Sequence, residues 1–530
     1  MDLLRLIEGL SDPAAYPHPV DTVEVRQTHI SVVFLAGAFA YKVKKPVALG
    51  FLDFRTLEQR RHFAEEEVRL NRRLAPGIYL SVVPVAQAED RLTIGGAGEV
   101  VDWAVQMVRL PDEAMLQARL ERGEVDAATI ASLARRLAAF HAAAEAGDRI
   151  AAFGRPEVVA GNLRENFAQA EPLLGAALSR PVLDRLAALS EMALAALRPT
   201  LAARAARGVP RDTHGDLRLE HVYLLAEKGQ PEDFVIIDCI EFNERFRFAD
   251  PIADMAFLVM ELEWSGRRDL ARVFTESYLA ASGDAEGRAL VSFYAAYRAA
   301  VRGKVEGMKA LEAEVPEAER SAALGRSRGL WLLALGMLER PERRPGLVLV
   351  GGLPGTGKST LARALAERAG FEVIRSDVVR KELAAAVRLS GPAAFEEGIY
   401  TPAWTDRTYA ACLDRAGAWL YEGRRVLVDA TFRAESWRQR FLETARRWGV
   451  PGVLLVCQAN PTVARRRLEA RRDDASEATS AVYEEAARRW EDFGAASRPA
   501  LHLLPTDDPR QPALDQALAA LAEHGLGEAA

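Results

Sequence analysis

Residues 347–360 read LVLVGGLPGTGKST, an apolar run that ends in the pattern G-x-x-x-x-G-K-[ST], and the helix-forming stretch LARALAERAG follows. Glycines in such a loop let backbone N–H groups turn toward phosphate oxygens, and the N-terminus of the next helix adds partial positive charge. The motif is specific when a strand precedes it and a helix follows, as the flanking residues predict here. A glycine-rich turn that only happens to precede a helix is the alternative. The sequence therefore predicts a site for a nucleoside triphosphate.

The motif assigns a role to each side chain in it. Lys358 is expected to reach the β- and γ-phosphates of ATP, and the Ser359 hydroxyl is expected to bind Mg²⁺. The predicted nucleotide-binding residues are Gly352, Leu353, Pro354, Gly355, Thr356, Gly357, Lys358, Ser359 and Thr360. ATP and Mg²⁺ are thus the expected cofactors.

Composition narrows the class of protein. The chain has 530 residues, 49% hydrophobic and 27% charged, which is typical of a soluble globular protein with two to four domains. Its net charge of −6 gives no general electrostatic footprint for nucleic acid, so a nucleic-acid partner is not favoured. The three cysteines, Cys239, Cys412 and Cys457, lie far apart without CxxC spacing, which argues against disulfides and zinc. No signal-peptide pattern and no uncharged stretch of membrane-span length occur, so we expect a cytoplasmic protein without a membrane partner.

The first part of the chain alternates between strand and helix patterns. Residues 28–46 predict a β-hairpin that turns at Ala36-Gly37, and residues 54–74 predict a charged amphipathic helix. Strands are expected at 79–85 and 101–109. Helical periodicity covers 125–205 and 250–340, and two strands joined by the polar turn AEKGQPED (226–233) lie between these regions.

The text ERPERRPG near Arg340 predicts a linker at 341–345 between a domain of residues 1–340 and one of residues 346–530. Strands at 347–351, 371–375, 425–429 and 453–457 alternate with helices in the second domain. Such alternation predicts an α/β fold with a parallel sheet flanked by helices.

A second group of polar residues lies in the first domain. Residues 214–221 read HGDLRLEH and residues 235–238 read VIID, so Asp216 and Asp238 stand at the edges of two neighbouring strands. One aspartate can accept the proton of an acceptor hydroxyl while the other holds Mg²⁺ on the phosphates. Their order along the chain, after a lysine-bearing strand, a glutamate-bearing helix and an expected hinge strand (106–111), is that of a protein-kinase-like pair of lobes.

Residues from about 25 to 300 resemble the aminoglycoside phosphotransferase family of the protein-kinase-like fold. The matching motifs are LAAFHA (137–142), HGDLRLEHV (214–222), VIIDCIEF (235–242) and FADPIADMAFL (248–258). The resemblance implies a bilobal α+β domain, with a small lobe at about 20–110 and a large lobe at about 111–340. It also implies that Asp216 is the catalytic-loop aspartate and Asp238 the metal-binding one. Asp250 and Asp254 match the family's trailing motif, in which the second aspartate usually braces the catalytic loop.

The resemblance places the ATP-binding lysine in AYKVKK. Lys42 is the first choice and Lys44, on the same strand face, is the alternative. The partner on the helix would be Glu67, with Glu66 as the second choice. Solvated surface charges are the other interpretation of these side chains.

The sequence departs from the family pattern at His221 and Cys239. His221 stands where the family carries an asparagine that binds a second metal ion. A neutral imidazole can ligate a metal, though it suits Mg²⁺ less well than oxygen does. A core histidine at a strand start is the other interpretation, and a lobe without catalytic activity follows if the metal arrangement is lost. Cys239 replaces a common tryptophan and is expected to pack as a small hydrophobic residue.

Residues from about 345 to 505 resemble P-loop kinases of small molecules and of polynucleotide ends, such as gluconate kinase, zeta-toxin-like proteins and polynucleotide kinase. The resemblance makes Asp377 the acid that deprotonates the acceptor hydroxyl, followed by Arg380, and places Asp429 at the Walker-B-like strand end as a metal ligand. Arg467 and Arg471 lie on one helix face as candidate lid arginines that neutralise charge during transfer, or as part of a solvated basic helix. The segment DDASEATS (473–480) is expected to form a lid.

Together these patterns predict a fusion of two kinase-type domains. The expected function is ATP- and Mg²⁺-dependent transfer of the γ-phosphate to a hydroxyl, most simply of a small molecule, at one or two sites. An ATP-hydrolysing switch or toxin-like regulator with a non-catalytic N-terminal lobe is the first alternative. A polynucleotide 5′-hydroxyl kinase is the second. The acceptor and the oligomeric state are not predicted.

Overall fold

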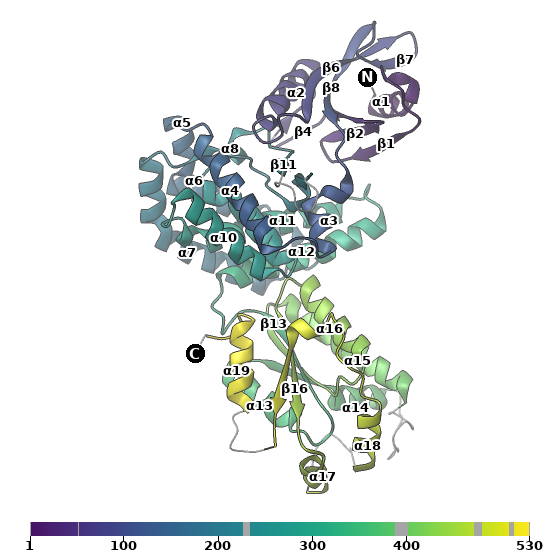
Figure 1. Ribbon diagram of the computed structural model, residues 1–530, viewed down its shortest axis with the longest axis vertical. Coiled ribbons are helices and arrows are strands. Elements are labelled where there is room, and N and C mark those ends of the chain that lie inside the picture. The colour runs from purple at the N-terminus through teal and green to yellow at the C-terminus, as the bar shows by residue number, and fades with distance from the viewer. Residues whose placement is uncertain are drawn as a thin grey trace. The chain divides into compact units, whose positions relative to one another are not determined.

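The computed structural model describes residues 2–50, 52–225, 234–386, 401–470, 480–507 and 513–528 (Figure 1). Its contacts divide the chain into two compact units. The N-terminal unit comprises Met1–Gly161, Leu197–Glu263 and Arg267–Tyr294, and the C-terminal unit comprises Asn162–Ala196, Trp264–Gly266 and Ala295–Ala530. The domain boundary expected at 341–345 stays a prediction.

A six-stranded antiparallel sheet begins the N-terminal unit. Its strands lie in the order β1-β2-β3-β8-β6-β7. They are β1 (Val23–Gln27), β2 (Ser31–Ala36), β3 (Phe39–Lys44), β6 (Tyr79–Ala88), β7 (Arg91–Ile94) and β8 (Glu99–Val108). The predicted hairpin is confirmed, because Ala36 pairs with Phe39 across a turn in which Gly37 has a φ of +59°.

The other elements of this region are α1 (Leu3–Leu10), α2 (Leu57–Asn71) and the short strands β4 (Ala48–Leu49) and β5 (Leu52–Asp53). The predicted helix is confirmed in α2. It begins after Thr56, whose side chain accepts from the Gln59 N–H while the Gln59 side chain reaches back to the Thr56 N–H. This capping box fixes the start of the helix that carries Glu66 and Glu67.

The rest of the N-terminal unit is mainly helical, and α4 packs along α10. Its helices are α3 (Leu116–Glu121), α4 (Ala127–Ala143), α5 (Asp148–Ala151), α6 (Pro156–Ala168), α8 (Glu244–Arg247), α9 (Pro251–Trp264) and α10 (Arg268–Ser282). Its strands form two antiparallel pairs, β9 (Arg211–Asp212) with β12 (Phe248–Ala249) and β10 (Val222–Leu224) with β11 (Phe234–Ile236). The β10–β11 pair brings residues 214–221 and 237–241 to the same edge. The turn predicted at 226–233 lies outside the described residues.

Three long helices follow or interrupt these elements: α7 (Arg180–Ala206), α11 (Arg288–Leu311) and α12 (Glu317–Leu338). Helix α7 has the length and the mean hydropathy, 1.2 over 18 residues, that a membrane span requires. The core helix of a soluble protein passes the same test. Charged side chains of α7 make ion pairs, such as Arg185 with Glu339 at 2.5 Å and Arg204 with Asp250 at 2.6 Å.

A five-stranded parallel sheet in the order β14-β15-β13-β16-β17 forms the centre of the C-terminal unit. Its strands are β13 (Gly346–Gly351), β14 (Glu372–Arg375), β15 (Arg425–Asp429), β16 (Gly452–Gln458) and β17 (Leu501–Pro505). The accompanying helices are α13 (Lys358–Ala369), α14 (Ser376–Ala386), α15 (Pro402–Tyr421), α16 (Glu435–Arg447), α17 (Pro461–Glu469), α18 (Ser480–Arg488) and α19 (Ala513–Glu523). The predicted parallel α/β arrangement and its four strands are confirmed, and β17 is an additional edge strand.

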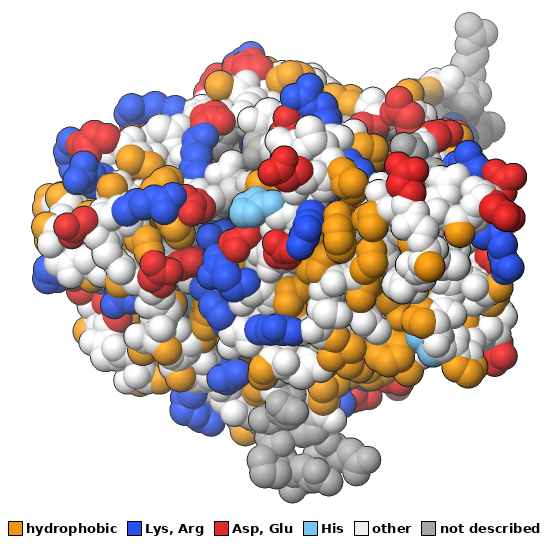
Figure 2. Space-filling model, turned by 90° about the horizontal axis from the view of Figure 1, so that it is seen from above, with side chains coloured by type: hydrophobic (Ala, Val, Ile, Leu, Met, Phe, Trp, Pro, Cys, Tyr) orange, Lys and Arg blue, Asp and Glu red, His pale blue; other side chains and the backbone are white. Residues whose placement is uncertain are grey.

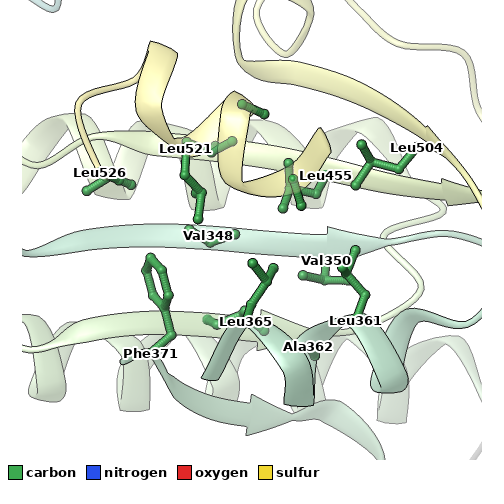
Figure 3. Packing of buried hydrophobic residues seen from close by; sticks show 14 of the residues in the cluster. Val348, Val350, Leu361, Ala362, Leu365, Phe371, Leu455, Leu504, Leu521 and Leu526 are labelled. Carbon is green, nitrogen blue, oxygen red and sulfur yellow. The ribbon is translucent and has the colours of Figure 1, made fainter. Parts of the chain in front are cut away.

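The core of this sheet fixes the position of the phosphate-binding loop. Val348 and Val350 of β13 are fully buried against Leu361 and Leu365 of α13, and Leu521 of α19 and Leu526 belong to the same cluster (Figure 3). A strand and helix packed on both sides of a loop leave the loop little freedom. The loop between β13 and α13 is therefore held at both ends.

Two arginines bind the segment that precedes β13. Arg425 Nη1 donates to the Pro341 carbonyl at 2.8 Å, and its Nη2 donates to the Leu526 carbonyl at 2.7 Å. Its guanidinium stacks 4.2 Å from the Phe371 ring centroid, and burial lowers its pKa to about 10. Arg185 of α7 donates to the Arg343 carbonyl at 2.5 Å. The segment 341–344 is thus tied to both α7 and β15.

Candidate functional site

The backbone between β13 and α13 has the conformation that phosphate binding requires. Gly352, Gly355 and Gly357 have φ values of +132°, +78° and +91°, which favour glycine. A Cβ atom at Gly352 would lie 2.4 Å from the Cys457 carbonyl oxygen, and one at Gly355 would lie 2.5 Å from the Ala464 carbonyl oxygen. All three glycines are therefore needed for the turn, and Gly352 and Gly355 also for the close approach of β16 and α17.

Side chains around this loop hold it and supply charge. Lys358, the first residue of α13, donates from Nζ to the Leu353 carbonyl at 2.8 Å, and the Thr356 hydroxyl donates to the same carbonyl at 2.7 Å. Thr506, next after β17, donates its hydroxyl to the Thr356 carbonyl at 2.7 Å. Loop, helix N-terminus and lysine together form an anion-binding cradle.

Asp429 lies at the carboxyl end of β15, opposite Val350 of β13. Its carboxylate is buried and accepts a hydrogen bond from the Ser359 side chain. Burial raises its pKa, against the lowering effects of the Lys358 ammonium and that hydrogen bond. A carboxylate and a hydroxyl in contact beside the cradle are suited to hold Mg²⁺ on a bound phosphate. The ion-pair distance from Arg375 Nε to Asp429 Oδ2 is 3.6 Å.

The structure brings Asp377 to the same edge of the sheet. It is the second residue of α14, directly after β14, and its charge contributes to the raised pKa of Asp429. Arg380 is buried one turn further along α14. Arg467 of α17 donates to the Thr506 carbonyl at 2.7 Å, close to Gly357. Arg471 and residues 473–479 of the expected lid lie outside the described residues.

In the N-terminal unit, both candidate lysines reach the same glutamate. The Nζ atoms of Lys42 and Lys44 lie 2.9 Å and 2.7 Å from the two carboxylate oxygens of Glu67, which is fully buried. Glu66 instead pairs with Arg69 at 2.7 Å. Only Lys42 extends to Asp238, at 2.6 Å. Burial alone would lower the pKa of Lys42, but the Asp238 and Glu67 carboxylates raise it well above its ordinary value.

Lys44 is buried and has a partner that the sequence analysis did not single out. It makes an ion pair with Glu241, also buried, and lies 5.0 Å from the Phe54 ring centroid. Burial raises the pKa of Glu241, while the Lys44 ammonium opposes that effect. The sequence does carry a signal for Glu241, which is a charged residue within the apolar run VIIDCIEF. A charge buried in such a run needs a partner of opposite charge, and this predicts an ion pair.

Asp238 has a backbone conformation that is uncommon for a residue with a side chain, with a φ of +64°. Two side chains hold the chain in this conformation. The Asp238 N–H donates to the Tyr79 hydroxyl at 3.1 Å, and the next N–H, of Cys239, donates to Asn71 Oδ1 at 2.9 Å. Such a strained residue kept in place by its surroundings is typical of a functional site. Cys239 itself is buried, as expected.

Asp254 braces the segment that carries Asp216. Its carboxylate accepts from the N–H groups of His214 at 3.1 Å and Gly215 at 2.8 Å, and it lies 3.0 Å from His141 Nε2. Burial alone would raise its pKa, but the His141 hydrogen bond and charge bring the pKa well below its usual value. The motifs LAAFHA, HGD and the trailing aspartate therefore meet at one point. Asp250 binds Arg204 at 2.6 Å instead.

Asp216, His221 and Asp238 lie together at the edge of the β10–β11 pair. His221, in the 3-10 helix η5 (Leu219–His221), places Nδ1 2.8 Å from the Asp216 carbonyl oxygen. Its Nε2 lies 3.5 Å from Asp238 Oδ2. Among the described residues, no three His, Cys, Asp or Glu side chains already form a group that could hold a metal ion.

Comparisons with known proteins place both units in context. Residues 347–493 match the AAA domain family AAA_33. The chain is 34% identical over 511 residues to the uncharacterized protein Rv2004c of Mycobacterium tuberculosis H37Rv. The aligned region covers 96% of this chain and 97% of that protein. The same values hold for the uncharacterized protein Mb2027c of Mycobacterium bovis. A gluconokinase from Sinorhizobium meliloti matches 34% of this chain and 94% of its own with 21% identity and a TM-score of 0.26.

Proposed function

We propose a function for this chain, which belongs to the same protein family as the mycobacterial proteins Rv2004c and Mb2027c. The chain is an ATP-dependent phosphotransferase that moves the γ-phosphate to a hydroxyl of a small molecule. The P-loop of the C-terminal unit is the principal site, and a second nucleotide site lies in the N-terminal unit.

The geometry of the loop between β13 and α13 carries this proposal. Three left-handed glycines, the Lys358 ammonium and the N-terminus of α13 converge on one point, and the Ser359–Asp429 contact lies beside it. In phosphoryl transfer the protein acts mainly by positioning and by neutralising charge, which this arrangement supplies. Mg²⁺ held by Ser359 and Asp429 would neutralise charge on the phosphates when bound.

The acceptor side of this site is assigned to Asp377, with Arg467 and Arg471 as transfer arginines. Asp377 follows the second strand of the P-loop unit at the carboxyl end, where ligands bind in open parallel sheets. A carboxylate there can accept the proton of an attacking hydroxyl. Arg467 Nη1 lies 3.9 Å from a Cβ placed at Gly357, so its guanidinium is next to the phosphate-binding loop.

The N-terminal unit is proposed to be an aminoglycoside-phosphotransferase-like domain. Its support is the contact chain Glu67–Lys42–Asp238 together with the Asp254 brace under Asp216. Lys42, positioned by its ion pair with Glu67, would hold ATP phosphates, Asp238 a metal ion, and Asp216 the acceptor hydroxyl. The strained φ of Asp238 fits a carboxylate that must be aimed at a ligand rather than at its own strand.

A transfer assay with γ-labelled ATP and the full chain tests the proposal. Sugars, polyols, aminoglycosides and 5′-hydroxyl oligonucleotides serve as acceptors. We expect label on a small-molecule hydroxyl, and we expect Lys358→Ala to remove most of the transfer. Arg368→Ala, an exposed basic residue at the other end of α13, is the matched control and should keep full activity.

Three results would contradict the proposal. ATP consumption that no acceptor stimulates would indicate the hydrolysing switch. Stimulation by oligonucleotides alone would indicate a polynucleotide kinase. The face seen in Figure 2 has basic and acidic side chains interspersed, without a single-sign basic field of the kind expected for a nucleic-acid surface. Undiminished transfer by Lys358→Ala would remove the P-loop assignment.

A further inference from the structure

The hydrogen bond between His221 and Asp216 fixes the tautomer of the imidazole. A carbonyl oxygen can only accept, so the 2.8 Å contact between His221 Nδ1 and the Asp216 carbonyl requires the hydrogen on Nδ1 in a neutral ring. The lone pair then lies on Nε2. A ring whose other nitrogen donates to a carbonyl is the usual state of a metal-ligating histidine.

The nitrogen that carries the lone pair, Nε2, lies near the candidate metal carboxylate. His221 Nε2 lies 3.5 Å from Asp238 Oδ2 and 3.7 Å from Glu220 Oε1. Asp238 is itself held by Lys42 through its other oxygen, Oδ1, at 2.6 Å, so Oδ2 is the atom turned toward the histidine. An imidazole nitrogen and a carboxylate oxygen are thus presented to the same place from two segments.

His214, the neighbouring histidine, uses both ring nitrogens for other contacts. His214 accepts the Asp216 N–H at Nδ1 at 3.3 Å, and its Nε2 lies 2.9 Å from the Ile237 carbonyl oxygen. Both ring nitrogens are therefore used by the backbone. His214 holds the two segments together, and His221 is the histidine that faces Asp238.

We propose that His221 Nε2 and Asp238 Oδ2 form a mixed nitrogen–oxygen site that binds a divalent first-row transition-metal ion in preference to Mg²⁺, with Mn²⁺ as the spectroscopic probe of that class. Magnesium prefers an all-oxygen set, whereas an imidazole ligand suits transition ions better. These two side chains supply two ligands, so the remaining positions fall to nucleotide phosphates and water. In that respect the inference rests on the proposed nucleotide site of the N-terminal unit.

Electron spin-echo spectroscopy of bound Mn²⁺ tests this inference directly. The full chain carrying Lys358→Ala, which weakens the P-loop site, is mixed with Mn²⁺ and a non-hydrolysable ATP analogue. We expect nitrogen modulation from a directly bound imidazole. His221→Asn should abolish that modulation and reduce the preference for Mn²⁺ over Mg²⁺ by about tenfold in a competition titration. His62→Asn, the same change at an exposed histidine of α2, should alter neither.

The outcomes separate this inference from the proposed function. Nucleotide bound with Mn²⁺ but without nitrogen modulation would overturn the mixed site and leave the phosphotransferase proposal standing. Loss of all nucleotide binding in the Lys358→Ala protein would overturn both the N-terminal nucleotide site and the metal site that depends on it. Modulation that persists in His221→Asn would assign the nitrogen ligand to another residue and would also overturn the inference.

Discussion

Lys42 Nζ and Asp238 Oδ1 lie 2.6 Å apart, although the two residues come from β3 and from the segment after β11. Lys44, two residues further along the same face of β3, contacts Glu67 and Glu241 instead. The two lysines therefore share Glu67 but differ in everything else they touch. Under the proposed function, this difference separates the nucleotide-binding lysine, Lys42, from the structural one, Lys44.

Lys42→Met and Lys44→Met should affect different properties, nucleotide binding and stability. Lys44 is 2% exposed and sits between two buried carboxylates, so its removal should destabilise the fold by about 3–5 kcal/mol. Lys42→Met should mainly remove nucleotide binding from the N-terminal site in the Lys358→Ala protein. Urea unfolding and nucleotide titration measure the two effects, with Lys45→Met as the neighbouring control. Equal loss of stability in both variants would contradict this division.

Asp216 and Asp238 should differ in which step they serve. Asp238→Ala removes the carboxylate next to Lys42 and should abolish metal-dependent nucleotide binding at the N-terminal site. Asp216→Asn keeps the shape of the residue and should spare binding but remove transfer at that site. Calorimetry and labelled-phosphate transfer, both in the Lys358→Ala protein, report these effects. If neither variant changes any phosphate transfer, all chemistry belongs to the P-loop.

Asp377→Asn should leave ATP affinity of the P-loop site within a few-fold and reduce transfer strongly, because Asp377 is assigned to the acceptor rather than to the nucleotide. Titration of ATP and single-turnover transfer give the two quantities. Asp414→Asn, at a residue of α15 outside the proposed site, is the matched control. A large loss of ATP affinity with normal transfer at saturation would instead make Asp377 a metal ligand.

Acidification should loosen the segment around His214 before the rest of the N-terminal unit. Burial lowers the pKa of His214 from 6.5 to about 4, so the unfolded state binds more protons than the folded state between these values. Stability should therefore fall as pH drops from 6.5 toward 4, by about 3 kcal/mol for a shift of this size. Hydrogen exchange of peptides from 211–225 follows this loss. The pH dependence should flatten in His214→Gln and persist in His62→Gln.

Much of the fold could be predicted because its patterns are local. The amphipathic pattern of α2, the strand before the P-loop and the P-loop motif itself all depend on immediate neighbours, and the helix and the strand were predicted correctly. β17 was missed because an edge strand that is half exposed carries a weak apolar pattern. The division of the chain into its two units depends on contacts between distant residues, which a local pattern does not contain.

For the candidate sites too, residues with a local sequence signal could be predicted, and residues defined by distant contacts could not. The pattern predicts Asp216 and Asp238 at strand edges, Asp377 after a strand and Asp429 at a strand end. In the structure Asp429 is the last residue of β15, Asp238 lies two residues after β11 and Asp377 is the second residue of α14. Asp216 lies in the segment between β9 and β10 and borders neither strand. The sequence pattern ranked Lys42 above Lys44 but left Lys44 as the alternative, because both lie on the same strand face and their contacts with Asp238 and Glu241 come from a distant segment. Tyr79 and Asn71, which hold the strained backbone at Asp238 and Cys239, gave no signal because their partners are backbone groups 159 and 168 positions away.

The hydrogen bonds that Arg425 makes to the segment before β13 decide where the C-terminal unit can be truncated. A cut placed after Arg344 would take away both the Pro341 and the Arg344 carbonyls, to which Arg425 Nη1 donates at 2.8 Å and 3.3 Å, and a buried arginine donor would lose its partners. Ending the polypeptide before Leu526 would take away its other carbonyl partner. The P-loop half therefore begins, in physical terms, several residues before its first strand, and a shortened version that fails to dissolve would say nothing about its chemistry.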